Sequence, residues 1–217
     1  MTKVKICCIQ TIVEAEMAIN AGASALGLVG SMPSGPGIIN LESAAAIVRS
    51  VGQKAETFLL SSKTTADEIL KEHNQVMSST IQLVDRVALK ELEVLRNQLN
   101  GVRLVQVIHV LGDESIEESR QVIPFVDYLL LDSGNPNLEV KELGGTGRIH
   151  NWNISKSIIQ TSSVPVYLAG GLKPSNIAEA IQFVRPYGVD LCSGVRSNGS
   201  LNKDTLNQFF TSVNAAH

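Results

Sequence analysis

The strongest constraint on the fold is a regular alternation between two kinds of segment along the 217 residues. Eight short runs rich in Val, Ile and Leu are each followed by a stretch in which apolar residues recur at helical spacing. Several runs are continuously apolar, as expected for parallel strands covered by helices. The runs read VKICCI, ALGLV, AETFLL, TIQLV, VRLVQVIHV, YLLLDS, PVYLAGG and VDLCSGV.

The helical stretches between these runs carry suitable end signals. Thr64 and Thr65 precede the acidic residues of one stretch, as N-caps do, and Gly22 and Gly52 fall where helices should end. The sequence therefore predicts strands that begin near residues 4, 26, 55, 80, 104, 128, 165 and 189. It predicts helices over 11–21, 41–51, 65–74, 88–99, 115–123, 153–161, 174–184 and 204–213.

Eight strand–helix units indicate an α/β fold of the (β/α)8 TIM-barrel type. A doubly wound open sheet has a similar local pattern, and the count of eight decides between the two. No linker or change in composition marks a boundary. We therefore expect residues 1–217 to form a single (β/α)8 barrel domain.

Charge and composition narrow the choice of partners. The net charge is −3, no block of Lys or Arg is present, and only 4% of residues are aromatic, so nucleic acid is not expected as a partner. No apolar stretch is long enough to cross a membrane, and the residues after Met1 do not resemble a signal peptide. We expect a cytoplasmic protein that acts on a small molecule, and we keep a homodimer as the assembly to test.

The three cysteines predict neither a disulfide framework nor a metal site. Three cannot all pair, and the adjacent Cys7 and Cys8 would point to opposite faces of a strand. Thiols also stay reduced in the cytoplasm. Cys7, Cys8 and Cys192 lack the ligand spacing of a zinc site.

Glycines follow the last three strands in the motifs GGTG (144–147), AGGL (169–172) and CSGV (192–195). Glycine lets the backbone approach a ligand, and the loops after strands seven and eight of a barrel often bind phosphate. The alternative is that these glycines only form turns. The motifs favour a phosphorylated substrate.

Two residues at strand ends are candidates for acid–base chemistry. Asp132 follows four apolar residues, where partial burial would raise the pKa of its carboxyl group and suit it to a general acid. It could instead cap the following turn. Cys7 lies at the end of strand one, where it could be a base or nucleophile, although an isolated strand cysteine is more often inert packing.

Other candidates have weaker support. Asp190 could bind a substrate hydroxyl or lie in the turn after Gly188. His109 ends strand five and could face the site. The loop after strand six, DSGNPNLEVKELGGTGRIHNW, is the longest and is a candidate lid or wall that carries Gly144, Gly145 and Arg148.

Five motifs, in the same order along the chain, resemble those of the phosphoribosylanthranilate isomerase family of tryptophan biosynthesis. Members of this family are (β/α)8 barrels. These motifs are VKICCI, AGASALGLV, LLLDS with GGTGR and a Trp, YLAGGLKPSN, and GVDLCSGVRSNGSLNKD. The resemblance implies an Amadori rearrangement without a cofactor. By motif position it implies Asp132 as the general acid that opens the ribose ring and Cys7 as the general base at C2′. It likewise implies that Gly170, Gly171, Ser193 and Gly194 bind the phosphate.

The sequence departs from the family pattern in the region that would hold the anthranilate. The family has an arginine after strand two that binds the anthranilate carboxylate, whereas LVGSMPSGPGII has no basic residue. The family's Q-L-H-G reads QLVD, and His109 replaces an arginine. Arg148 or Lys141 could supply a replacement cation. Two alternatives therefore stay open, namely an isomerase of another phosphorylated aminosugar and a non-catalytic phosphosugar-binding protein. Retained Cys7 and Asp132 argue against the second.

Overall fold

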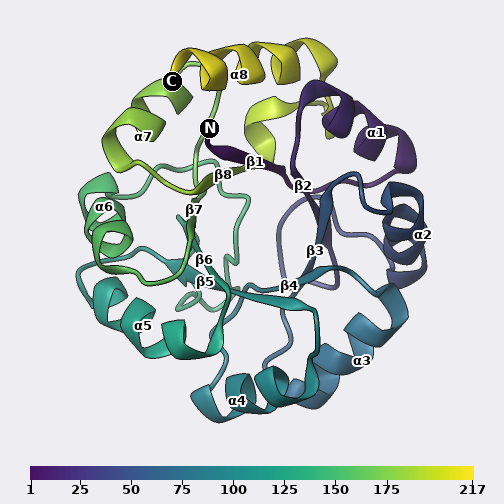
Figure 1. Ribbon diagram of the computed structural model, residues 1–217, viewed down its shortest axis with the longest axis vertical. Coiled ribbons are helices and arrows are strands. Elements are labelled where there is room, and N and C mark those ends of the chain that lie inside the picture. Colours follow the sequence, from purple (N-terminus) through teal and green to yellow (C-terminus); the bar gives the residue numbers. More distant parts are fainter.

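The computed structural model describes all residues from Met1 to His217. Eight parallel strands close into a barrel in the order of the chain, and β1 completes the ring by pairing with β8 (Figure 1). The predicted fold class is confirmed. The barrel strands are β1 (Lys3–Ile6), β2 (Ala25–Val29), β3 (Glu56–Ser61), β4 (Thr80–Leu83), β5 (Arg103–His109), β6 (Tyr128–Asp132), β7 (Val166–Leu168) and β8 (Gly188–Leu191).

Eight α-helices surround the strands, as Figure 1 shows in the view down the barrel. Side chains of Thr11, Asn40 and Asn202 cap the first, second and last helix by accepting a hydrogen bond from a backbone N–H in the first turn. The helices are α1 (Ile12–Ala21), α2 (Leu41–Val51), α3 (Ala66–Val76), α4 (Leu89–Gln98), α5 (Glu114–Val122), α6 (Trp152–Thr161), α7 (Ile177–Val184) and α8 (Lys203–Ala215).

The start of α7 differs most from the prediction, which began the helix at Pro174. The residues before Ile177 form a turn instead. Asn176 stabilises this turn by accepting a hydrogen bond from the Lys173 N–H at 2.9 Å and by donating one to the Gly171 carbonyl at 3.0 Å. The turn carries the chain from the AGGL motif into the helix.

The strands separate two apolar clusters. Val4 and Ile6 of β1 belong to the large cluster between the barrel and its helices, whereas Cys7, directly after β1, belongs to a smaller cluster inside the barrel. Inside the barrel the rings of Phe58 and Tyr167 pack edge to face at 5.9 Å. Aromatic side chains thus fill part of the interior, so a ligand must bind at an end of the barrel.

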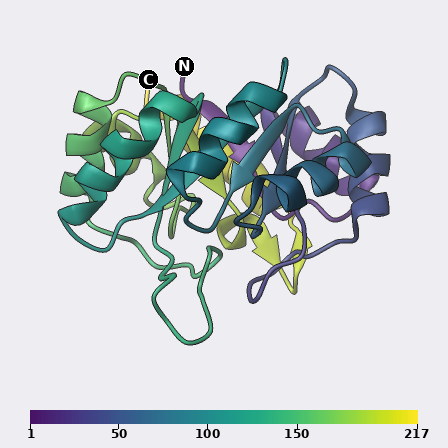
Figure 2. The same ribbon diagram turned by 90° about the horizontal axis from the view of Figure 1, so that it is seen from below.

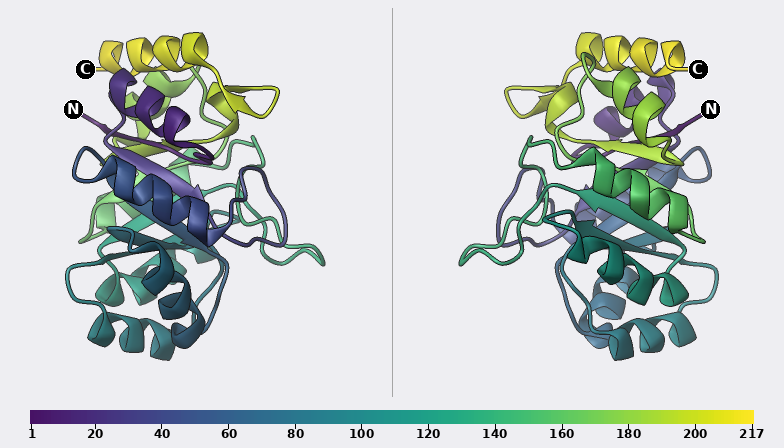
Figure 3. Two further views of the ribbon diagram at one scale, coloured as in Figure 1. Left: turned by 90° about the vertical axis from the view of Figure 1, so that its right-hand side faces the viewer. Right: turned by 90° about the vertical axis from the view of Figure 1, so that its left-hand side faces the viewer.

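The loops after the strands gather at one end of the barrel, which Figures 2 and 3 show as the end with the longest projections. The loop after β6 meets the loop after β2, where the Ser34 hydroxyl donates a hydrogen bond to the Lys141 carbonyl at 2.6 Å. A short hairpin of β9 (Arg196–Ser197) and β10 (Ser200–Leu201) follows β8 at the same end. None of the helices has the length and apolar character that crossing a bilayer demands.

Candidate active site

A pocket opens where the carboxyl ends of the strands meet. It brings together residues that lie at or just after the ends of β1, β6, β7 and β8 and are far apart in the sequence. Most of the predicted site residues line it, namely Cys7, Asp132, Gly144, Gly145, Gly170, Gly171, Asp190 and Ser193. The candidate acid and the candidate base therefore face one cavity.

Cys7 directly follows β1 and is the free cysteine of the chain. It is buried but lines the pocket. Burial raises the pKa of the Cys7 thiol to about 11, while Lys5 acts in the opposite direction. The sulfur therefore holds its proton at neutral pH, and a nearby cation is the group that favours its ionised form.

Asp190 lies within β8 and not in a turn, so the turn interpretation was wrong. Its carboxylate accepts a hydrogen bond from the Lys5 ammonium at 2.9 Å. Register explains the contact, because Lys5 and Asp190 are direct neighbours across the β1–β8 pair. Asp190 faces the pocket, while Lys5 is completely buried beneath it.

Asp132 ends β6 at the rim of the pocket. Burial raises the pKa of its carboxyl group, although the Ser133 N–H, which donates to Oδ1 at 2.7 Å, and His109 oppose the shift. A carboxyl group with a raised pKa keeps its proton to higher pH. Asp132 can therefore act as a general acid.

The glycine motifs after β7 and β8 bring two loops into direct contact. A Cβ at Gly194 would lie 2.1 Å from the Leu172 carbonyl oxygen, so only glycine permits this approach. Gly170 and Gly171 have φ values of 81° and 63°, which glycine adopts without strain. Ser193 begins a 3-10 turn (Ser193–Val195) at the pocket wall, and Gly194 supports the wall from behind.

Comparisons with known proteins agree with this arrangement. The family model described as "N-(5'phosphoribosyl)anthranilate (PRA) isomerase" matches residues 4–212. The chain belongs to the phosphoribosylanthranilate isomerase family. One member, the N-(5'-phosphoribosyl)anthranilate isomerase of Methanocella arvoryzae, is 34% identical over 91% of this chain and 90% of its own.

Solved structures of family members have the same fold. The phosphoribosyl anthranilate isomerase from Thermus thermophilus aligns with a TM-score of 0.83 and 25% identity over the full length of both chains. The enzyme from Thermococcus kodakaraensis aligns with a TM-score of 0.80 and 28% identity over 98% of this chain and 99% of its own. The family assignment thus covers the whole barrel.

This member of the phosphoribosylanthranilate isomerase family has no cation in the pocket wall. The lining contains no Lys, Arg or His side chain. Arg148 is exposed and pairs with Glu142, and Lys141 pairs with Asp85 at 2.5 Å. The structure therefore does not place either of the suggested replacement cations in the pocket lining, because each pairs with a carboxylate outside the pocket.

His109 also lies outside the main pocket. Its Nε2 is 2.9 Å from the Val84 carbonyl oxygen, and the ring lines a separate small pocket beside α5. The other ring nitrogen, Nδ1, is buried and has no hydrogen-bond partner. This placement does not support the expectation that His109 faces the substrate. His109 ends β5 as expected, but its position at a strand end does not reveal to which side the ring turns.

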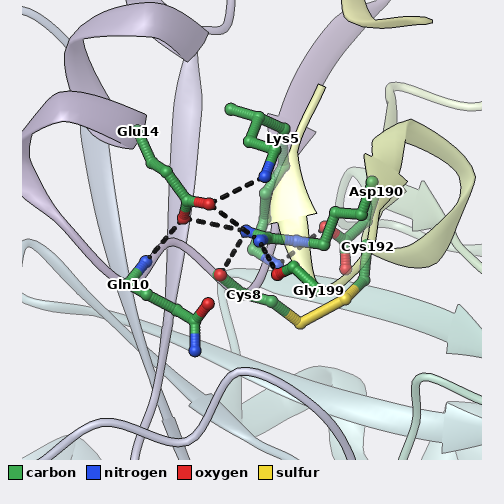
Figure 4. The surroundings of a disulfide bond; sticks show 9 residues. Lys5, Cys8, Gln10, Glu14, Asp190, Cys192 and Gly199 are labelled. Carbon is green, nitrogen blue, oxygen red and sulfur yellow. Dashed lines mark hydrogen bonds and ion pairs between the residues drawn. A yellow bond between two sulfur atoms is a disulfide. The ribbon is translucent and has the colours of Figure 1, made fainter. Parts of the chain in front are cut away.

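The expectation of no disulfide was wrong, because Cys8 and Cys192 form one (Figure 4). The expectation assumed that Cys7 and Cys8 lie in a strand and point to opposite faces, but β1 ends at Ile6, before both residues. Cys8 has a φ of 62°, in the left-handed region, which turns its side chain into the same interior cluster as Cys7. The bond joins the chain beyond β1 to the chain beyond β8, next to Ser193.

An ion pair between Arg196 and Glu14 lies close to the disulfide and also connects the segments that follow β1 and β8. Arg196 donates to a carboxylate oxygen of Glu14 at 2.9 Å and also hydrogen bonds to the Cys8 carbonyl. Burial alone would raise the pKa of Glu14, but hydrogen bonds from Arg196 and from backbone N–H groups hold it below its usual value. These contacts fix the loop that carries the 3-10 turn.

Sequence reasoning missed two polar residues, Gln82 in the pocket lining and Lys5 buried beneath it. Gln82 lines the pocket from β4, and its Oε1 has no hydrogen-bond partner. It lies two residues before Val84, the first position at which this strand end departs from the family pattern. Lys5 carried a signal, because it lies two residues before Cys7 and side chains two apart in a strand face the same side.

Proposed function

We propose that this chain is an isomerase that converts N-(5-phosphoribosyl)anthranilate to 1-(carboxyphenylamino)-1-deoxyribulose 5-phosphate, a step of tryptophan biosynthesis. Membership of the phosphoribosylanthranilate isomerase family supports this reaction. The single observation that carries the mechanism is that Cys7 and Asp132 face one pocket beside glycine-rich loops.

In the first step Asp132 donates its proton to the ribose ring oxygen. The bond between that oxygen and C1′ breaks, and the nitrogen lone pair forms an imine at C1′. The raised pKa of Asp132 supports this role, because the carboxyl group must hold its proton until the ring opens.

In the second step Cys7, as a thiolate, removes the proton from C2′. The C2′–H electron pair forms a double bond between C1′ and C2′, and the imine π electrons return to nitrogen. The resulting enolamine then tautomerises to the ketone. Cys7 follows β1 and Asp132 ends β6, three strands away around the barrel, which supports a substrate that lies across the mouth of the barrel between them.

The phosphate group would be bound by backbone N–H groups of the loops after β7 and β8. Gly170, Gly171 and Ser193 line that side of the pocket, and Gly144 and Gly145 close it from the long loop. Fixing the phosphate there orients C1′ and C2′ between the acid and the base.

The test is a direct assay with N-(5-phosphoribosyl)anthranilate, together with complementation of a tryptophan auxotroph that lacks this isomerase. Growth and turnover are expected for the wild-type chain. Cys7→Ser should lower kcat by roughly 10²–10⁴ while a phosphate-bearing product analogue still binds. Turnover by this variant at the wild-type rate would reject Cys7 as the base.

A second candidate is the same rearrangement on a phosphoribosylamine without a carboxylate. The specific observation in its favour is that the pocket presents Asp132 and Asp190 but no cation. A buried carboxylate without a partner is costly. Comparing kcat/KM for the anthranilate and aniline derivatives separates the candidates, since a preference for the uncharged aglycone would select the second.

We also propose a cytoplasmic homodimer. The long loop after β6 exposes three apolar side chains, namely Leu138, Val140 and Ile149. Such an exposed apolar patch supports an association of two copies. Sedimentation at micromolar concentration should give twice the monomer mass, and a monomer would reject the dimer. The Cys8–Cys192 disulfide is unusual for a reducing cytoplasm, so fractionation of the cell that makes the protein is the direct test of its location.

A further inference from the structure

The most unusual side chain near the site is Lys5. It is completely buried, although it does not line the pocket and so does not touch the substrate. A lysine without solvent is expensive to keep charged unless anionic groups surround it. The groups around its ammonium therefore indicate its purpose.

Two potential anions lie beside the Lys5 ammonium. Asp190 accepts a hydrogen bond from it at 2.9 Å. Cys7 lies two residues further along the chain, on the same inner side of the barrel. Burial alone would lower the pKa of Lys5, but Asp190 and Cys7 more than offset this and raise it. The ammonium therefore stays charged.

Gly27 of β2 creates the space in which sulfur and ammonium face each other. A Cβ at Gly27 would lie 2.7 Å from the Cys7 Sγ and 3.0 Å from the Lys5 Nζ. Both atoms thus border one space that a side chain at this position would fill. The ring of Phe58, with its centroid 5.3 Å from Nζ, faces the same cation.

We propose that Lys5 is a positioning residue for Cys7, whose ammonium group, held by Asp190, stabilises the thiolate that accepts the C2′ proton. This inference rests on the proposed function for the proton transfer itself. When the C2′–H bond breaks, the proton moves to the Cys7 sulfur, and Lys5 keeps its own proton throughout. A simple structural ion pair between Lys5 and Asp190 would have no such effect on the sulfur.

The charged groups that face Cys7 come from three strands. Lys5 of β1 favours the thiolate, whereas Asp190 of β8 opposes it, and Asp132 of β6 lines the same pocket. The neighbouring strand β2 contributes no titratable side chain. Removing Lys5 and removing the charge of Asp190 should therefore shift the ionisation of Cys7 in opposite directions.

The test is the rate at which iodoacetamide alkylates Cys7 at a fixed pH below the pKa of its thiol. The protein is used with the Cys8–Cys192 disulfide intact. Cys7 is then the free thiol, so mass spectrometry of the peptide assigns the adduct without ambiguity. Lys5→Met should slow alkylation about tenfold or more, because an opposite charge at this range shifts a pKa by roughly one to three units. Asp190→Asn should accelerate it, and Lys3→Met, an exposed lysine on the same strand, should leave it unchanged.

Alkylation of Lys5→Met at the wild-type rate would overturn the proposal, as would an unchanged or slower rate in Asp190→Asn. If Lys5→Met does not fold, the Asp190→Asn measurement decides. Kinetics add a second readout, since Lys5→Met should lower kcat about tenfold with little change in KM. Failure of the wild-type chain to convert N-(5-phosphoribosyl)anthranilate would reject the substrate while leaving the alkylation result intact.

Discussion

The two halves of the pocket differ in their chemistry. The charged half, which comprises Cys7, Asp132, Asp190 and Ser193, comes from β1, β6 and β8 and contains every group able to move a proton. The apolar half, formed by Val29, Met32, Leu60 and Val84, comes from β2, β3, β4 and their loops.

This difference shows how a barrel can place the groups that carry out the reaction and the groups that select the substrate on different strands. Each strand end and its loop contribute independently to the site, so one sector can change while another stays. The charged half here contains the proposed acid and base and borders the glycine motifs, whereas the apolar half contains no cation. The predictions below test whether the two halves are as separate as their geometry indicates.

The largest effect is expected from Asp132→Asn in the charged half. Loss of the acid should lower kcat/KM by roughly 10²–10⁴. The wild-type pH profile should be bell-shaped, since the active form needs Asp132 protonated and Cys7 ionised. With the pKa of Asp132 below that of Cys7, activity rises with pH up to the raised Asp132 pKa and falls above about 11. Without this acid, the residual activity of the variant should follow the ionisation of Cys7 alone, rising with pH to about 11 and not falling above it. A bell-shaped profile for Asp132→Asn would contradict the assignment.

The next largest effect is expected from removal of the disulfide, which connects the segments after β1 and β8 in the charged half. Cys8→Ser together with Cys192→Ser should lower the free energy of unfolding by about 2–4 kcal/mol, because the bond closes a loop with a sequence separation of 184. Urea unfolding of this variant and of the wild type measures the difference. Reduction of the wild type should reproduce the loss, and equal midpoints would show that the bond adds no stability.

A smaller effect is expected from Gly194→Ala, which separates the loops after β7 and β8. The added Cβ cannot fit 2.1 Å from the Leu172 oxygen, so backbone donors to the phosphate should move. Loss of one hydrogen bond to a charged group costs about 1.5–3 kcal/mol, equivalent to tenfold or more in KM. Ser197→Ala in the neighbouring hairpin provides a control, since the Ser197 side chain is exposed. A wild-type KM for Gly194→Ala would contradict the phosphate role.

The smallest effect is expected at the loop cations beside the apolar half. Arg148→Ala and Lys141→Ala should each change KM by less than about twofold, because both side chains pair with carboxylates outside the pocket. Steady-state kinetics at two salt concentrations measure this. A large increase in KM for a carboxylated substrate would instead show that one of these loop cations reaches the ligand during turnover.

The sequence predicted the fold and the charged half because both depend on local pattern. Each strand begins within a residue of its expected position, since apolar runs and caps are local signals. Cys7 and Asp132 were identified because they follow apolar runs at strand ends. The glycine motifs were found for the same reason.

Long-range contacts explain what the sequence did not predict. Cys8 and Cys192 pair only because β1 and β8 close the barrel and because Cys8 adopts a left-handed conformation. The role of Lys5 depends on Asp190, which is its neighbour only across the same seam. His109 ends a strand like the others, but its ring turns toward α5 and away from the pocket.

The bond between Cys8 and Cys192 also makes most of the polypeptide a covalent ring. A protease that cuts once within the long loop after β6 would therefore open the ring without releasing either fragment. Nicked protein should migrate as one species on a non-reducing gel and as two after a thiol is added.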